Sequence, residues 1–283
     1  MSEFGIMQGR LSPSQGDRLQ FFPDEWEKEF EIAKNLGFSS LEWVFDWSEY
    51  WKNPVWYLTD TSKNLLAIRE SAESQGICIV TACFDYLMKY TLLQRDNNYL
   101  DTLNVLQRTI PKLAQMGVNI ISIPLLENAS VRTEREKDEI RNTLNLFRRL
   151  LDGHKIDLSL ETEMAGEELR NYIDSFENPR IGVCYDTGNS TTLEHDLPQD
   201  IRLLGNRIKE VHLKDRKFGS RQSVYLGTGD VDFDACFSAL KSVHFNGPYI
   251  LQAWRGTDYL NDAKRQLEYV RSKMQSVREG GQT

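Results

Sequence analysis

The run IISIPLL at residues 120–126 is apolar at almost every position, and a glycine three residues before it ends a stretch of helical periodicity. A run of this kind is typical of a strand in a parallel sheet covered by helices, because both faces of such a strand are buried. The same order of helix, glycine and apolar run recurs along the chain. The glycines that stand where a left-handed C-cap would end a helix are Gly37, Gly76, Gly117 and Gly153.

Eight strand candidates follow one another at intervals of about 35 residues, the size of a βα unit. They are residues 5–10, 39–45, 77–84, 119–126, 157–163, 181–186, 210–214 and 248–254. Eight units without a linker predict an α/β chain that forms a single (β/α)8 TIM barrel over residues 1–283. A doubly wound open sheet is the alternative, but no GxGxxG motif follows the first strand to support dinucleotide binding.

The composition describes a globular chain. Of its 283 residues 40% are hydrophobic and 11% aromatic, which excludes intrinsic disorder. A net charge of −8 disfavours nucleic acid as a partner. No run approaches the ~20 apolar residues that cross a bilayer, and residues 1–10 lack a secretory pattern, so we expect a cytoplasmic protein with no membrane partner. The cysteines have no CxxC spacing and are expected to be buried thiols: Cys78, Cys83, Cys184 and Cys236.

Three potential metal ligands stand on consecutive predicted strands, at the carboxyl ends where TIM barrels carry their function. They are Glu161, Asp186 and His212. Two carboxylates and an imidazole in an apolar barrel mouth are costly to bury unless a cation compensates them. The pattern therefore indicates a divalent metal of the Mn²⁺, Mg²⁺, Co²⁺ or Zn²⁺ kind. Hydrogen bonding within the barrel core is the alternative for each residue taken alone.

Other polar side chains at the predicted strand ends are candidates for substrate contact. They are Gln8, Arg10, Glu42, Asp215 and Arg255. An aromatic cluster at residues 43–56 would either wall a sugar site by stacking or shield a hydrophobic edge. The loop LGTGD at residues 226–230 is expected to be a turn that leads into a helix capped by Asp232.

The order of several motifs resembles the xylose-isomerase-like barrels of the sugar phosphate isomerase/epimerase superfamily, over essentially the whole chain. The motifs are IMQGRLSP at residues 6–13, LSLETE at 158–163, CYDTGNS at 184–190, VHLKDR at 211–216, LGTGDVDF at 226–233 and ILQAWRG at 250–256. The resemblance implies a small carbohydrate substrate, either a sugar or a sugar phosphate. It also implies that Glu161, Asp186 and His212 hold the metal, with Gln252 at the fourth position.

The family mechanism implies proton transfer beside a carbonyl through a metal-stabilised enediolate, with Glu161 as the base. Gln252 departs from the family pattern, in which a second glutamate stands on strand eight. An amide oxygen can ligate a metal but cannot exchange a proton as a carboxylate does. Lys214 or Glu127 is therefore expected to supply the second acid or base in an epimerisation.

Three functions remain open at this point. A sugar isomerase or epimerase is the first, and a sugar-binding barrel without turnover is the alternative that Gln252 motivates. A nuclease similar to the related apurinic endonucleases is disfavoured, because those enzymes use several histidines and only His212 of the four stands at a predicted strand end. The sequence permits a homo-oligomer without indicating one.

Overall fold

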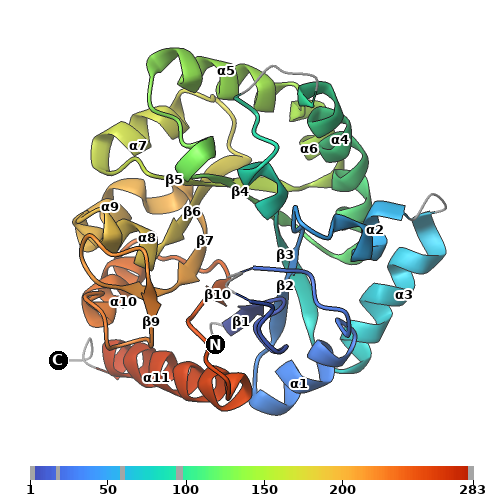
Figure 1. The fold of residues 1–283 in the computed structure, drawn as a ribbon. Coiled ribbons are helices and arrows are strands. Elements are labelled where there is room, and N and C mark those ends of the chain that lie inside the picture. Colours follow the sequence, from blue (N-terminus) through green and yellow to red (C-terminus); the bar gives the residue numbers. More distant parts are fainter. Residues whose placement is uncertain (1–3, 17–19, 58–60, 94–97, 280–283) are drawn as a thin grey trace.

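Eight parallel strands close into a barrel in the order β1-β10-β7-β6-β5-β4-β3-β2 (Figure 1). The computed structural model describes residues 4–16, 20–57, 61–93 and 98–279. The barrel strands are β1 (Phe4–Met7), β2 (Ser40–Val44), β3 (Cys78–Cys83), β4 (Ile120–Leu125), β5 (Asp157–Thr162), β6 (Ile181–Asp186), β7 (Ile208–Leu213) and β10 (Tyr249–Leu251). All eight predicted strands are therefore present, and the closed order confirms the TIM barrel and excludes the open sheet.

The helices form a ring outside the strands (Figure 1). They are α1 (Lys28–Leu36), α2 (Pro54–Tyr57), α3 (Thr61–Ser74), α4 (Tyr99–Met116), α5 (Glu134–Asn145), α6 (Arg148–His154), α7 (Gly166–Asp174), α8 (Thr187–Thr192), α9 (Leu197–Leu204), α10 (Phe233–Ser242) and α11 (Tyr259–Glu279). Short 3-10 turns are η1 (Tyr50–Lys52), η2 (Asp85–Met88), η3 (Glu127–Ala129) and η4 (Gly205–Arg207). None of the described helices is long and apolar enough to cross a membrane.

The barrel interior holds an apolar cluster and a group of buried charges. Four buried side chains from the adjacent strands β10, β1, β2 and β3 form a cluster separate from the main core: Met7, Val44, Cys83 and Ile250. Contact among side chains of four adjacent strands requires that they point into the barrel. The buried ionisable side chains Glu42, Glu161, Glu210 and His212 come from β2, β5 and β7. Strand β2 therefore contributes to both groups, with Val44 in the apolar cluster and Glu42 beside His212.

Three of the four glycine caps are confirmed. Gly37, Gly76 and Gly117 have φ values of 98°, 74° and 96°, the left-handed conformation that favours glycine. The prediction for Gly153 is wrong, because this residue lies inside α6. Lys155 takes the left-handed position instead, with φ of 56°, and its backbone N–H closes the last turn onto Leu151 and Asp152.

A short antiparallel hairpin that the sequence did not indicate follows β7 at the barrel mouth. It consists of β8 (Asp215–Arg216) and β9 (Ser223–Val224). The Asp215 carboxylate accepts hydrogen bonds from the backbone N–H groups of Gly227, Gly229 and Val231, at 2.8, 3.0 and 3.2 Å. Asp215 therefore holds the LGTGD loop in place, and Asp232 caps α10 as predicted by accepting from the Ala235 N–H.

The four cysteines are all free thiols. Cys83, Cys184 and Cys236 are buried as expected, but Cys78 is exposed. The first residues of β3 alternate between outer and inner faces, and Cys78 opens the strand on the outer one. The expectation of four buried thiols is therefore corrected for Cys78.

Two glycine substitutions test this account of the backbone. A Cβ at Gly182 in β6 would lie 2.3 Å from the Arg207 carbonyl oxygen, which cannot retreat without disturbing the pairing of β6 with β7. We expect Gly182→Ala to lower the free energy of unfolding by about 1–3 kcal/mol. Gly153→Ala should raise it by about 0.5–1 kcal/mol, because the position is helical and open. Urea unfolding of both variants measures the difference, and equal effects would contradict it.

Candidate functional site

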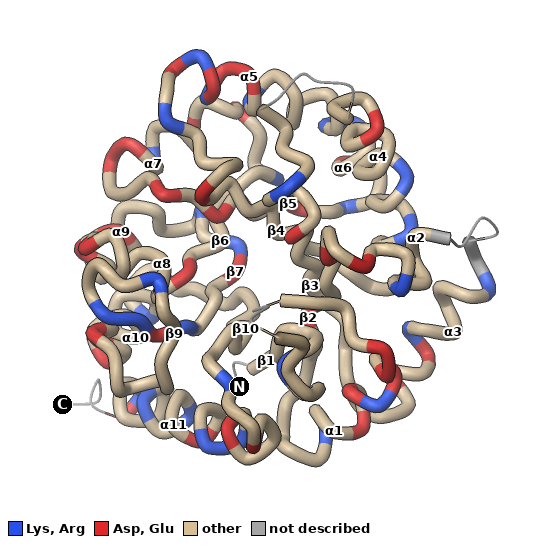
Figure 2. The backbone as a smooth tube through the Cα atoms, in the orientation of Figure 1, with Lys and Arg blue, Asp and Glu red and all other residues tan. Residues whose placement is uncertain are grey.

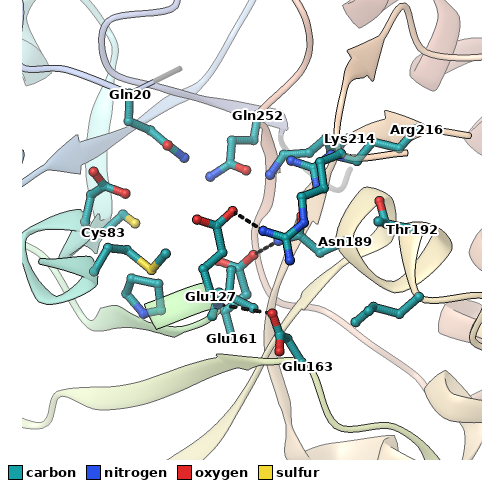
Figure 3. A pocket seen from close by; sticks show the side chains of 16 residues that line it. Gln20, Cys83, Glu127, Glu161, Glu163, Asn189, Thr192, Lys214, Arg216 and Gln252 are labelled. Carbon is teal, nitrogen blue, oxygen red and sulfur yellow. Dashed lines mark hydrogen bonds and ion pairs between the residues drawn. The ribbon is translucent and has the colours of Figure 1, made fainter. Parts of the chain in front are cut away.

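A pocket opens at the carboxyl ends of the strands. Figure 3 shows its side chains converging from the loops after β3, β4, β5 and β6 and from the region of β7 and β10. Its lining residues are Gln20, Cys83, Asp85, Met88, Pro124, Leu126, Glu127, Glu161, Glu163, Asn189, Thr192, Leu193, Lys214, Arg216, Arg221 and Gln252. Most of these residues have polar or charged side chains, so the pocket offers many hydrogen-bonding groups to a ligand.

Glu161 lines this pocket, and Asp186 and His212, the other two residues predicted to hold a metal, stand beside it in the barrel interior. They come from the adjacent strands β5, β6 and β7, and Asp186 and His212 are partners in the β6–β7 register. The His212 Nδ1 atom lies 3.8 Å from Glu161 Oε2. Ligand atoms of Glu161, His212 and the Cys184 thiol all lie within 4.8 Å of one another. Cys184 thus joins the group as a member that sequence reasoning missed.

A lysine neutralises Asp186. The Lys214 Nζ atom lies 2.7 Å from Asp186 Oδ2, and both side chains are buried. The other oxygen, Oδ1, accepts from the Asn189 N–H and caps α8. Burial by itself would raise the pKa of Asp186, but the positive charges of Lys214 and His212 outweigh it and lower the pKa. Lys214 therefore supplies part of the positive charge that the sequence analysis expected to compensate the buried carboxylates.

Burial acts on the pKa values of Glu161 and His212 in opposite directions. It raises the pKa of Glu161 to about 7, with the charge of Asp186 adding to the effect. For His212 burial acts to lower the pKa, but the carboxylates of Glu42, Glu210 and Glu161 overcome it and raise the pKa to about 10. The interior therefore stabilises a positive charge at the imidazole and favours a proton on Glu161.

Glu42 contacts the His212 ring at Nε2 and so orients it. Its carboxylate lies 3.2 Å from His212 Nε2, and both side chains are fully buried. The other ring nitrogen, Nδ1, lies on the side of Glu161 and has no hydrogen-bond partner among the described residues. Glu210 lies on the same side, where Ser159 donates to it, and burial followed by the charge of Glu42 raises its pKa to about 8. Glu42 was expected to contact substrate, but it does not line the pocket.

Gln252 presents an unpaired acceptor to the pocket. Its side chain is only 1% exposed, and its amide nitrogen donates to Met7 Sδ at 3.4 Å. Within the described part of the chain its Oε1 atom has no hydrogen-bond partner. Figure 3 shows Gln252 on the pocket wall above Glu127 and Glu161. The position fits the fourth ligand that the resemblance implied, with an amide in place of a carboxylate.

The remaining residues predicted to touch substrate lie behind the pocket lining. Gln8 accepts from the Val44 N–H at 3.1 Å and joins β1 to β2. Arg10 is 3% exposed and donates to the Gln252 carbonyl at 3.5 Å. Arg255 donates to the Gly9 carbonyl and stacks over the Phe21 ring at 4.7 Å. Each of these side chains, like those of Glu42 and Asp215, contacts another part of the protein, and none of the five lines the pocket, so their geometry does not support direct substrate contact.

Glu127, Glu163 and Arg221 form the rim of the pocket. Glu127 pairs with Arg221 at 3.1 Å, and both side chains are largely exposed. Glu163 accepts from the Glu127 N–H and from Ser130 Oγ, at 3.1 and 2.6 Å, and so fastens η3 to the end of β5. Figure 2 shows Lys and Arg gathered along the hairpin region near α8. Although the chain is acidic overall, one side of the barrel mouth is therefore basic.

The pocket lining includes residues that the sequence analysis did not assign to the site, among them Asn189, Asp85 and Arg216. Asn189 donates from its side chain to Glu161 Oε1, and its place three residues after Asp186 in the first turn of α8 was the available signal. Asp85 follows directly after the predicted strand 77–84, so the strand-end criterion applied elsewhere would have found it. Arg216 also lines the pocket, and its Nε atom is buried without a partner among the described residues.

The aromatic cluster after β2 divides between core and surface. Trp43 is fully buried and lies against Phe22 and Trp26. Trp47 and Trp51 are 36% and 51% exposed, and neither lines the pocket. Of the two alternatives for this cluster, shielding of a hydrophobic edge fits the structure, and a stacking wall for a sugar finds no support in it.

Comparison with known proteins identifies the fold family. The model of the xylose isomerase-like TIM barrel family matches residues 30–273. The chain belongs to this family. L-ribulose-5-phosphate 3-epimerase UlaE of Escherichia coli O1:K1 is 23% identical over 264 residues, which cover 88% of this chain and 90% of the relative.

Solved structures of this family have the same fold. The structure of L-ribulose 3-epimerase superposes with a TM-score of 0.78 at 18% identity and covers 99% of this chain and 97% of its own. A D-psicose 3-epimerase determined in the presence of D-fructose has a TM-score of 0.74 at 16% identity, with 96% and 99% covered. The IolI protein with a bound zinc atom also has a TM-score of 0.74, at 17% identity, with 96% and 99% covered. Sugar epimerases are thus prominent among the relatives.

Removing the lysine tests how the buried charge is compensated. Lys214→Met leaves the buried Asp186 carboxylate without its partner, so we expect the free energy of unfolding of the metal-free protein to fall by about 3–5 kcal/mol. Added Mn²⁺ should restore more stability to this variant than to the unmodified protein, because no ammonium group competes for Asp186.

Thermal unfolding with EDTA and with Mn²⁺ measures both effects. Lys273→Met is the matched control, because Lys273 pairs with Asp234 at 2.6 Å at the surface and should be worth less than about 1 kcal/mol. An equal Mn²⁺ shift in Lys214→Met and in the unmodified protein would contradict the account.

Proposed function

We propose that this protein is a divalent-metal-dependent isomerase or epimerase of a small sugar or sugar phosphate. The observation that carries the proposal is the convergence of Glu161 and Gln252 in one pocket at the barrel mouth, where Gln252 Oε1 is an acceptor without a hydrogen-bond partner among the described residues. Asp186 and His212 stand beside Glu161 on the adjacent strands β6 and β7. Three of the relatives named above are sugar epimerases, which supports the same reaction class here.

The donor set fits a divalent cation. Glu161 and Asp186 offer carboxylate oxygens, His212 offers Nδ1 and Gln252 offers an amide oxygen, a mixture that suits Mn²⁺, Mg²⁺, Co²⁺ or Zn²⁺. The contact of His212 Nε2 with Glu42 is the kind of outer hydrogen bond that orients a ligating imidazole. When bound, the cation would polarise the substrate carbonyl and so acidify the adjacent C–H bond. Two carboxylates and M²⁺ would make the site formally neutral.

Glu161 would remove the proton beside the substrate carbonyl. Its pKa of about 7 lies near the operating pH, where a group works best as both base and acid. Asn189 donates to Glu161 Oε1, and the other oxygen, Oε2, lies 3.8 Å from His212 Nδ1. Lys214 and Glu127 are the other proton-transfer candidates from the sequence, and both line the pocket. Lys214 pairs with Asp186, and Glu127 pairs with Arg221. These ion pairs restrict both side chains.

A direct assay tests the proposed function. The protein is loaded with Mn²⁺ and incubated in D₂O with L-ribulose 5-phosphate, L-ribulose, D-psicose, D-tagatose and D-fructose, and NMR follows isomer formation and deuterium entry beside the carbonyl. Glu161→Gln should lower both rates by about 10²- to 10⁴-fold, because the base is lost. Glu134→Gln is the control, since this side chain is 86% exposed on α5. Normal deuterium entry in Glu161→Gln would refute its role.

A sugar-binding protein without turnover is the second candidate, and Gln252 is the observation that favours it. An amide at this position removes the proton-transfer group that the family pattern would supply. Stabilisation of the protein by one of these sugars, with neither isomer formation nor deuterium entry, would support binding alone.

Restoring the carboxylate gives a further prediction. Gln252→Glu adds a negative charge beside Glu161 and Asp186, so the metal-free protein should lose stability through repulsion and burial. Mn²⁺ should bind this variant at least about tenfold more tightly, because a carboxylate is a stronger ligand than an amide for a hard cation. Calorimetric titration with Mn²⁺ and thermal unfolding in EDTA measure the two effects. Unchanged affinity would place position 252 outside the coordination sphere.

A further inference from the structure

Asp85 faces the pocket from the wall opposite the hairpin side. It follows β3, which stands opposite β7 in the closed barrel order. Cys83 and Asp85 both line the pocket, whereas Phe84 between them is fully buried in the core. Figure 3 shows Cys83 across the pocket from Lys214 and Asn189. A substrate held at the floor by β5, β6 and β7 would therefore lie between these residues and Asp85.

The backbone on both sides of Asp85 is fastened to neighbouring strands. The Phe84 N–H donates to the Ser122 carbonyl of β4 at 3.0 Å. The Tyr86 N–H donates to the Phe45 carbonyl just after β2 at 2.7 Å. The Phe84 ring also stacks on Phe45, with centroids 4.3 Å apart. Asp85 thus projects from a rigid support, which a group that must meet a reacting carbon requires.

The Asp85 carboxylate is free to act. Its side chain is half-buried and forms neither a hydrogen bond nor an ion pair with the residues that the structure describes. Burial, followed by the negative charges of Asp46 and Glu161, raises its pKa to about 7. A carboxyl group in this state can hold a proton or release one near neutral pH.

Inversion at a carbon beside a carbonyl needs a second proton-transfer group besides Glu161. The proton leaves one face of the carbon and a new one arrives at the other. Gln252 cannot supply it, and the other two candidates are already paired, Lys214 with Asp186 and Glu127 with Arg221. Asp85 is an unpaired carboxylate in the same pocket, on a different wall from Glu161.

We propose that Asp85 is the second proton-transfer group of the reaction, acting on the face of the substrate opposite to Glu161. This assignment rests on the proposed function. Glu161 takes the proton from the carbon beside the carbonyl, and the electron pair of that C–H bond moves into the enediolate. Protonated Asp85 then delivers its proton to the other face, a new C–H bond forms and the carbonyl returns. Glu161 passes its proton to water, and Asp85 takes one from water, which resets the site. In the reverse direction the two roles exchange.

Asp85→Asn tests the assignment in the Mn²⁺-loaded protein in D₂O, with whichever of the five ketoses above the unmodified protein converts. We expect inversion to fall by at least about 100-fold, because the amide cannot deliver a proton. Deuterium entry into the starting isomer should continue within about tenfold, because Glu161 still removes and returns a proton on its own face. Asp85→Glu should recover part of the inversion rate.

The outcomes separate this assignment from the proposed function. Inversion by Asp85→Asn within about threefold of the unmodified rate would overturn the assignment alone. Equal loss of inversion and deuterium entry, in a variant with an unchanged melting temperature and an unchanged Mn²⁺ shift, would also overturn it. Should Asp85→Asn unfold, Asp85→Glu decides, since normal exchange with slowed inversion supports the assignment and equal slowing refutes it. Absence of both reactions in the unmodified protein would overturn the proposed function together with the assignment.

Discussion

Four carboxylates are buried around one imidazole inside the barrel, and their mutual repulsion is the constraint on which the site depends. Glu42, Glu161, Asp186 and Glu210 are each at most 4% exposed. Charges of like sign in such an interior destabilise the fold unless cations or protons offset them. The chain supplies Lys214 against Asp186 and holds a proton on His212, whose pKa rises to about 10. Burial and the neighbouring carboxylates raise the pKa values of Glu161 and Glu210, which favours protonation of both and so reduces the remaining repulsion.

The same constraint explains why the pocket suits a cation. A divalent ion would compensate the carboxylates more completely than one ammonium group, and the Gln252 Oε1 atom is an acceptor without a partner among the described residues. The amide at Gln252 leaves one charge fewer to neutralise than a glutamate would. This amide also limits the chemistry, because Gln252 could hold a metal but could not act as an acid or a base. The unpaired carboxylate of Asp85 lies in the same pocket and would supply the proton transfer that Gln252 cannot perform.

Much of the site was predictable from strand ends, because parallel strands in a closed barrel bring their carboxyl ends to one mouth. Glu161, Asp186 and His212 were found in this way, and Asp85 would have been found by the same criterion. Arg10, Arg255 and Asp215 also stand at strand ends, yet their side chains turn to backbone groups of neighbouring segments. Whether a strand-end side chain faces substrate or protein depends on loops from distant parts of the chain, which local patterns do not encode.

The sequence by itself determined the barrel, the places of its eight strands and the three consecutive ligand types, because periodicity and residue chemistry are local properties. Tertiary structure decided which charges are paired. Lys214 meets Asp186 only because β6 and β7 are neighbours in register. Glu42 reaches His212 from β2 across the barrel interior. Pairing of this kind joins residues as far as 170 positions apart in the chain, so it follows from closure of the barrel and not from any stretch of sequence.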